Sequence, residues 1–157
     1  MSGEKNNTMR LLDQRGIPYQ VYTFSPDIHS AQGVAEVTGL PASMVFKTLV
    51  VMPAQGRPIL VLIPGGHKLD LRRLARTLRI KKTRMATQRE AEQATGLKVG
   101  GISPLALLDR GFAVYLDHSA CTLEEILVSA GERGKNLRLL TTDLIALTEA
   151  EIVDVSG

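Results

Sequence analysis

The chain has 157 residues, of which 44% are hydrophobic and 22% charged, and its net charge is +3. This length and composition suit one well-buried domain spanning residues 1–157. One cysteine excludes an intrachain disulfide, and no apolar run approaches the roughly 20 residues that a membrane helix needs. The first seven residues are polar where a signal peptide would be apolar, so we expect a soluble cytoplasmic protein with no membrane partner.

Capping residues and glycines indicate short helices along the chain. Asparagine, serine, aspartate and threonine each provide a side-chain oxygen that can cap the first turn of a helix. Helices are expected at 8–15 after Asn7, between Ser30 and Gly39, after Asp70, between Thr87 and Gly96, and from residue 141.

Runs of β-branched, aromatic and other apolar residues predict the strands. They are expected at 19–24, 45–52, 59–63, 82–85, 112–116, 125–129, 137–140 and, as an edge strand, 152–155. The second and third runs are separated by a loop of hairpin length, so they should pair antiparallel. The pattern favours an α+β fold, with a mixed, partly antiparallel β-sheet and flanking helices in one domain.

Lys47 is the unusual residue of the strand predicted at 45–52. Period-two alternation places its side chain on the same face as Val45, Leu49 and Val51. Burial disfavours a lysine charge unless an anion compensates it, and a carboxyl, carbonyl or phosphate group of a ligand would do so. A strand-end lysine whose ammonium reaches water is the alternative.

Two adjacent glycines, Gly100 and Gly101, are followed by Ile102-Ser103-Pro104. Glycines expose backbone N–H groups and let a polar ligand approach the main chain, which is how proteins commonly hold a carbonyl oxygen. With Lys47 they indicate a site for an acyl group beside an anionic group. A plain structural turn is the alternative, because a Gly-Gly pair alone is weak evidence of a site.

Basic residues concentrate in the segment 68–84, which holds eight of them against one acidic residue, Asp70. On the helix after Asp70, Arg72, Arg76 and Arg79 recur at helical spacing away from the apolar side. Such a face suits a polyphosphate backbone, as in nucleic acid, and a solvated helix face is the alternative.

Neither a metal site nor a protein nucleophile is indicated. His29, His67 and His118 lack the spacing of zinc ligands, so we assign no metal and expect no cofactor. Cys121 lies three residues after His118, but catalytic thiol–imidazole pairs are assembled in space, so this spacing carries little weight.

Three blocks of sequence, in this order, resemble the YbaK/EbsC family: VFKTLV at 45–50, GHKLDLRRLA at 66–75 and TGLKVGGISP at 95–104. The similarity runs from about Met9 to about Val155 and is strongest to its YbaK-type Cys-tRNA(Pro) deacylases. The resemblance implies an editing domain that removes cysteine from mischarged tRNA(Pro), and also from Cys-tRNA(Cys), with prolyl-tRNA synthetase as a further partner. Cysteine and proline have similar volumes, so a synthetase pocket built by shape cannot reject cysteine strongly.

The resemblance also implies roles for particular residues. Lys47 would hold the aminoacyl end, and Gly100 with Gly101 would present backbone N–H groups to the scissile carbonyl. The implied substrate-binding residues are Phe24, Ser30, Thr48, Ile102, Ser103, Pro104 and Asn136. The implied tRNA-binding residues are Lys68, Arg72, Arg73, Arg76 and Arg79.

Phe24 and Asn136 depart from close relatives, which have a tyrosine and an aspartate at these places, and this bears on amino-acid specificity. The resemblance implies that the thiolate of the bound cysteine attacks its own ester carbonyl, releasing tRNA and a cyclic thiolactone. The protein would then supply geometry and oxyanion stabilisation. Editing of another small amino acid such as alanine, and a non-catalytic tRNA-binding module, stay open as alternatives.

Overall fold

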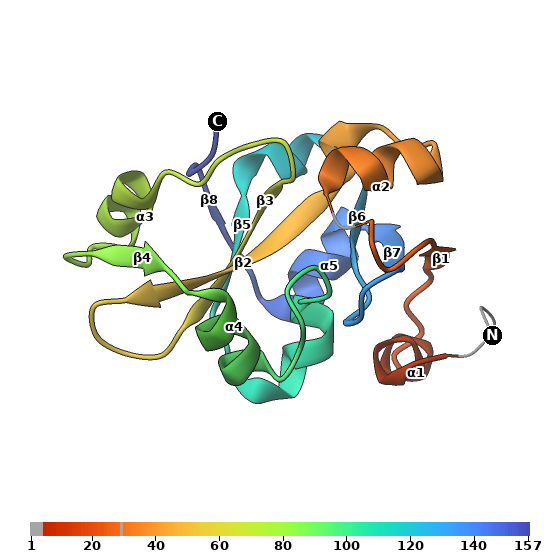
Figure 1. Cartoon of the computed structure of the whole chain (residues 1–157), viewed down its shortest axis with the longest axis horizontal. Coiled ribbons are helices and arrows are strands. Elements are labelled where there is room, and N and C mark those ends of the chain that lie inside the picture. Colours follow the sequence, from red (N-terminus) through yellow and green to blue (C-terminus); the bar gives the residue numbers. More distant parts are fainter. Residues whose placement is uncertain (1–4, 29) are drawn as a thin grey trace.

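An antiparallel hairpin of β2 (Phe46–Pro53) and β3 (Ile59–Pro64) forms the centre of the computed structural model, which describes residues 5–28 and 30–157 (Figure 1). It belongs to a five-stranded sheet of order β4-β2-β3-β5-β8, completed by β4 (Thr83–Met85), β5 (Val114–Asp117) and β8 (Glu151–Val153). β4 pairs antiparallel with β2, whereas β5 and β8 add parallel. The predicted hairpin and the mixed sheet are therefore confirmed.

The remaining strands form a second, three-stranded antiparallel sheet of order β1-β7-β6. Its strands are β1 (Gln20–Thr23), β6 (Glu125–Ser129) and β7 (Lys135–Leu140). A parallel bridge between Val45 and Leu127 joins the two sheets just before β2 begins. The sequence patterns predict the strands but not their division into two sheets, because pairing depends on contacts between distant segments.

The helices lie mostly where capping residues place them. The α-helices are α1 (Asn7–Gln14), α2 (Ala31–Thr38), α3 (Leu71–Leu78), α4 (Gln88–Thr95) and α5 (Thr141–Thr148). Ser30 Oγ accepts the N–H of Gly33 at 3.0 Å, and Thr87 forms the expected capping box with Glu90. The cap of α1 is Asn6 rather than Asn7, so this helix begins one residue earlier than predicted.

The sequence does not predict the 3₁₀ helices, because segments of three to seven residues leave little periodicity in the sequence. They are η1 (Ala42–Met44), η2 (Pro104–Arg110) and η3 (His118–Thr122). Within the described part of the chain, no helix is long and apolar enough to span a bilayer.

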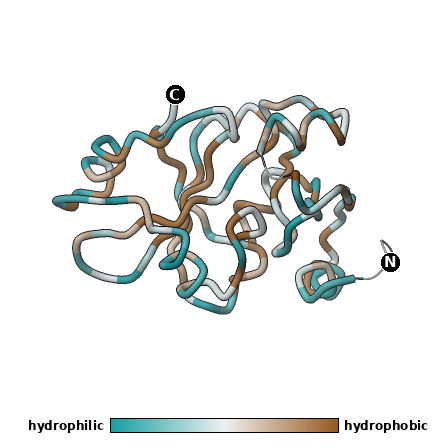
Figure 2. Tube along the Cα trace, in the orientation of Figure 1, coloured by the Kyte–Doolittle hydropathy of each residue, from teal (hydrophilic) through white to brown (hydrophobic). Residues whose placement is uncertain are grey.

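The core lies on both faces of β3, whose residues are all buried. Leu60 and Leu62 face a large cluster built with α1, η2, α5 and the second sheet, and Val61 and Ile63 face a smaller cluster beneath α3. Figure 2 shows this as hydrophobic colour concentrated along the central strands. The hairpin is thus fixed from both sides, which gives β2 a rigid position beside the second sheet.

Candidate functional site

A cavity of about 390 Å³ opens between α2, the first half of β2, the ends of β6 and β7, and the loop that follows α4. Seven of the sequence-predicted site residues line it: Phe24, Ser30, Lys47, Thr48, Gly100, Ile102 and Asn136. Further lining residues, which the sequence analysis did not identify, are Ile28, Ala31, Val34, Val45, Phe46, Leu49, Gly65, Val99 and Ser129. The walls therefore combine apolar side chains with several polar ones, as in a site that binds a small polar molecule.

Lys47 enters this cavity from β2, where it pairs with Ile63 of β3. Its side chain has no hydrogen bond or ion pair with any residue in 5–28 or 30–157. Burial holds the pKa of the Lys47 ammonium below its ordinary value, although much of the side chain is still accessible. A lysine without a counter-ion among apolar walls is prepared to bind an electron-rich group of a ligand.

Gly100 belongs to a tight turn on the loop after α4. Gly101 N donates to Lys98 O at 2.8 Å, and Gly100 has a φ of +95° at the third position of this turn. Val99 at the second position is not among the positive-φ residues, so the turn is of type II. Glycine is favoured at this third position because an L side chain is strained there.

Gly101, Ser103 and Pro104 lie next to the cavity but do not line it. The N–H of Gly101 is used in the turn, and a Cβ there would come within 2.8 Å of the backbone of Glu132 and Arg133. Ser103 is fully buried, and its Oγ accepts the N–H of Leu105 at 3.2 Å to cap η2, which Pro104 begins. These three residues therefore fix the backbone that follows Gly100 and do not line the cavity themselves.

The opposite wall comes from the second sheet. Asn136 of β7 pairs in register with Ser129 of β6, and both line the cavity. Phe24, just after β1, is held to the same sheet because its N–H donates to Gly134 O at 3.0 Å. No pattern in the sequence identifies Ser129, since only the register of β6 with β7 places it beside Asn136.

Gly65 allows α2 to close over the cavity. A Cβ on Gly65 would lie 1.9 Å from the Cβ of Ala31, so any larger residue would push α2 away. No local sequence pattern reveals this role of Gly65, because the approach of α2 to the end of β3 is a tertiary contact.

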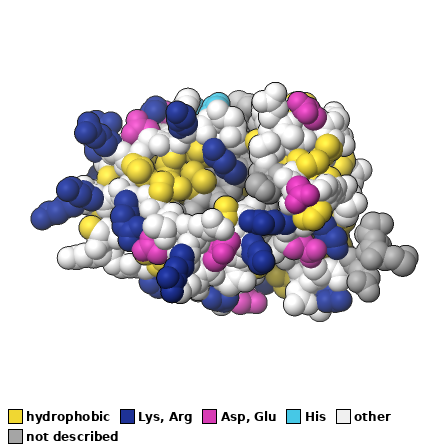
Figure 3. Space-filling view, in the orientation of Figure 1, with side chains coloured by type: hydrophobic (Ala, Val, Ile, Leu, Met, Phe, Trp, Pro, Cys, Tyr) yellow, Lys and Arg dark blue, Asp and Glu magenta, His cyan; other side chains and the backbone are white. Residues whose placement is uncertain are grey.

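The basic residues of α3 form a separate surface. Leu74 and Ala75 are buried against the sheet, whereas Arg72, Arg76 and Arg79 are exposed. Figure 3 shows dark blue side chains gathered over α3 and β4 at the left end of the molecule. Lys68 is exposed just before the helix, and Arg73 differs from the others because it forms an ion pair with Asp154 at 3.0 Å.

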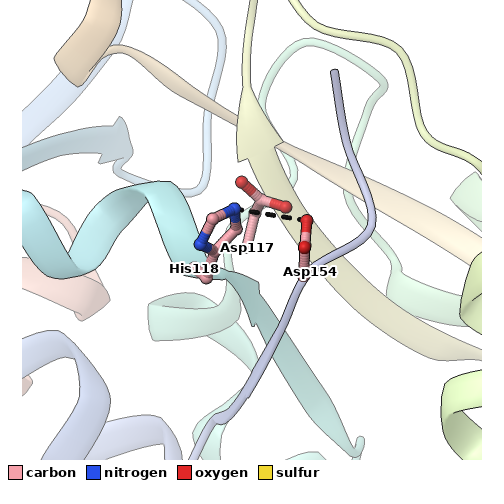
Figure 4. Close-up of side chains that lie close together, drawn as sticks. All are labelled: Asp117, His118 and Asp154. Carbon is pink, nitrogen blue, oxygen red and sulfur yellow. Dashed lines mark ion pairs between the residues drawn. The ribbon is translucent and has the colours of Figure 1, made fainter.

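A small cluster outside the cavity is formed by Asp117, His118 and Asp154 (Figure 4). One carboxylate oxygen of each aspartate and one ring nitrogen of His118 lie within 4.8 Å of one another. His118 Nε2 lies 3.2 Å from Asp154 Oδ1, which Arg73 also contacts. Burial would raise the pKa of the Asp117 carboxyl, but hydrogen bonds from Ser119 and from the N–H of Val155 hold it below its ordinary value. These contacts attach the C-terminal segment to α3 and β5.

The other residues considered from the sequence lie away from the cavity. Cys121 is exposed in η3, and His67 Nδ1 lies 2.9 Å from Ser156 Oγ. His29 lies outside the described residues.

The class of protein follows from its sequence and fold: the chain belongs to the aminoacyl-tRNA editing domain family, whose sequence model matches residues 25–147. A curated relative from Enterococcus faecalis, provisionally named the Cys-tRNA(Pro)/Cys-tRNA(Cys) deacylase EbsC, is 36% identical over 98% of this chain and 94% of its own length. The resemblance stated from the sequence is thereby confirmed.

More distant similarity is found both to a segment of a larger enzyme and to chains of about this length. The proline–tRNA ligase of Staphylococcus aureus is 27% identical over 72% of this chain, which corresponds to only 19% of that enzyme. The crystal structure of a provisionally assigned trans-editing enzyme for prolyl-tRNA synthetase has a TM-score of 0.82 and 25% identity, and the match covers 98% of this chain and 99% of that chain. A crystal structure of a hypothetical protein, at 24% identity and a TM-score of 0.86, has the same fold over 94% of this chain and 97% of its own.

Proposed function

We propose that this protein is a trans-editing deacylase that removes cysteine from mischarged tRNA(Pro), and from Cys-tRNA(Cys). Membership of the editing family and the similarity to EbsC support the reaction class. The observation that carries the proposal is the cavity itself. Lys47 of β2, which has no partner among residues 5–28 and 30–157, lines it together with the turn at Gly100. A small aminoacyl group fits a site with one positive charge and one backbone donor.

Lys47 and Gly100 would hold the two ends of the aminoacyl ester. The ammonium of Lys47 binds electron-rich oxygens near the terminal ribose, and the N–H of Gly100 donates to the carbonyl oxygen as negative charge develops there. Thr48, Ser30 and Asn136 add polar groups to the wall that faces the substrate. Because these groups are fixed by strands and caps, little reorganisation is needed during the reaction.

The nucleophile in this proposal is the substrate's own thiolate. Its sulfur forms a bond to the ester carbonyl carbon, and the bond from that carbon to the ribose oxygen breaks. The ribose oxygen takes up a proton, so the two products are free tRNA and a cyclic thiolactone. The exposed position of Cys121 outside the cavity supports a mechanism without a protein thiol. A few per cent of a free cysteine is thiolate at pH 7, so the attacking group is already present in the substrate.

Lys68 and the exposed arginines of α3 would bind the tRNA backbone, with Arg73 contributing less because Asp154 neutralises it. We further propose that residues 1–157 act as one editing domain in the cytoplasm, where aminoacyl-tRNA is used, and that prolyl-tRNA synthetase is a partner. The similarity to a segment of proline–tRNA ligase supports that association.

The test is turnover by the purified protein of tRNA(Pro) charged with cysteine, alanine or proline. We expect rapid loss of the cysteinyl ester, with the prolyl ester left intact. Preferred cleavage of the alanyl ester would assign the cavity to another small amino acid. Binding of all three without cleavage would instead show a non-catalytic tRNA-binding module.

A further inference from the structure

The turn that carries Gly100 is held by two side chains from outside the cavity. Glu92 of α4 accepts the N–H of Val99 at Oε2, 2.9 Å away. Arg133, on the loop between β6 and β7, donates from Nε to the carbonyl oxygen of Val99 at 2.7 Å. One residue of the turn is therefore fixed to two separate elements.

The hydrogen bond from Arg133 also determines where the N–H of Gly100 points. The carbonyl of Val99 and the N–H of Gly100 belong to the same peptide unit, which is planar and trans, so the two groups point in opposite directions. Arg133 is not among the residues that line the cavity, whereas Val99 and Gly100 are. A carbonyl drawn toward Arg133 therefore turns the N–H of Gly100 away from Arg133, at a residue that lines the cavity.

That N–H has no hydrogen-bond partner among residues 5–28 and 30–157. The hydrogen bond of a β-turn joins its first and fourth residues, so the N–H of the third residue, Gly100, is not used by the turn and, in this exposed residue, is open to a ligand. The adjacent N–H groups of Val99 and Gly101 are both used, by Glu92 and by Lys98. Of these three consecutive donors, the one at Gly100 is kept available for a ligand.

We propose that Arg133 and Glu92 are positioning residues that hold the Val99–Gly100 peptide in the orientation needed for Gly100 to act as oxyanion donor. This inference rests on the proposed deacylase function. Arg133 has a second effect, because a positive charge behind the carbonyl polarises the peptide and makes its N–H a stronger donor. Glu92 fixes the preceding peptide unit by accepting the N–H of Val99, so that Val99 cannot rotate and carry the Val99–Gly100 peptide with it.

The experiment compares Arg133→Met, which keeps the length of the side chain but removes the donor, with Arg89→Met on the exposed side of α4 as a matched loss of one charge. In single turnover with saturating protein, we expect Arg133→Met to slow cysteinyl ester cleavage about 10- to 100-fold, as a displaced catalytic donor does. Affinity for tRNA should stay within about twofold of wild type, and Arg89→Met should cleave normally.

Glu92 provides an independent variant. Glu92→Gln keeps an oxygen that can accept the N–H of Val99 and should retain activity, whereas Glu92→Ala should lose it. If Glu92 had a purely structural role, Glu92→Gln and Glu92→Ala would both have a lower thermal midpoint, and Glu92→Gln would not restore activity. The amide resonance of Gly100 in ¹H–¹⁵N spectra should shift in Arg133→Met and Glu92→Ala and stay in place in Arg89→Met.

The outcomes separate this inference from the proposed function. An active wild type, with Arg133→Met and Glu92→Ala equally active and the Gly100 resonance unmoved, overturns the positioning role and leaves the deacylase standing. A wild type that cleaves none of the aminoacyl-tRNAs removes the proposed function. In that case the amide resonance of Gly100 is the only test. A shift in both Arg133→Met and Glu92→Ala supports the positioning of the Val99–Gly100 peptide by these two residues, and no shift overturns that role.

Discussion

Lys47 and Gly100 come from segments more than fifty residues apart and reach one cavity with different kinds of support. Lys47 is fixed by β2, which pairs with a strand on each side. Gly100 lies on a loop, so its orientation depends on the hydrogen bonds made by Val99. A side-chain charge on a strand and a backbone donor on a loop therefore respond differently to substitution.

Replacing Lys47 with alanine should abolish deacylation while leaving the fold intact. Its ammonium has no partner among the described residues, so the substitution removes a group that would bind a ligand rather than one that packs. We expect the rate to fall by about 10²-fold or more, as for other single charge-stabilising groups in active sites. Cleavage rates and circular dichroism check this, with Lys5→Ala, outside the cavity, as control. Near-normal turnover by Lys47→Ala would remove Lys47 from the site.

Phe24 and Asn136 should set amino-acid preference rather than activity as such. Both line the cavity on the wall made by the second sheet. Phe24→Tyr adds a hydroxyl to an apolar wall, and Asn136→Asp adds a charge where only 8% of the residue is exposed. We expect changes in the relative cleavage rates of cysteinyl and alanyl esters, measured on the same tRNA. Unchanged ratios in both variants would assign specificity to other residues of the cavity.

At the scale of elements, the contact between α2 and the end of β3 sets the width of the cavity. Gly65→Ala would place a methyl group where Ala31 already lies, and such overpacking costs about 1–3 kcal/mol. Gly66→Ala is the matched control, because nothing lies within 4 Å of the Cβ it would add. We expect thermal unfolding to show a lower midpoint only for Gly65→Ala, together with slower deacylation. Equal midpoints for the two variants would show that α2 can shift freely.

The basic face of α3 leads to a prediction about binding rather than chemistry. Arg72→Glu with Arg76→Glu should weaken tRNA binding and reduce its dependence on salt, by about one unit of slope for each phosphate that is no longer neutralised. Arg15→Glu with Arg89→Glu makes the same change in net charge elsewhere. Filter-binding measurements over a range of salt concentrations would test this. Cleavage of a small cysteinyl ester should be unaffected, so equal impairment on both substrates would mean that α3 supports the fold.

The source of the nucleophile concerns the whole molecule, since no element contributes a cysteine to the cavity. tRNA(Pro) charged with 2-aminobutyrate or serine, which match cysteine in size, should bind comparably and react far more slowly. Cys121→Ser should change little. Measured cleavage rates and the chemical form of the released amino acid provide the test. Full activity on 2-aminobutyryl-tRNA, or free cysteine carrying solvent oxygen before any thiolactone forms, would point to an activated water instead.

Local sequence signals determined most of the elements of this protein. The caps at Ser30, Asp70 and Thr87, and the alternation around Lys47, act over a few residues, so they can be read from the chain itself. The resemblance to the editing family identified Lys47 and Gly100 by their motifs. These signals and the resemblance were sufficient for the α+β class and for residues on both walls of the cavity, Phe24 and Asn136 included.

Tertiary structure decided which further residues complete and support the cavity. The register of β6 with β7 brought Ser129 beside Asn136, and the absence of a side chain at Gly65 brought α2 over the cavity. Arg133 and Glu92 reached the turn at Val99 from two other elements. Such contacts join segments that are distant in sequence, and their free energy depends on geometry that no local pattern encodes. The residues that hold the proposed donor were therefore visible only once the chain was folded.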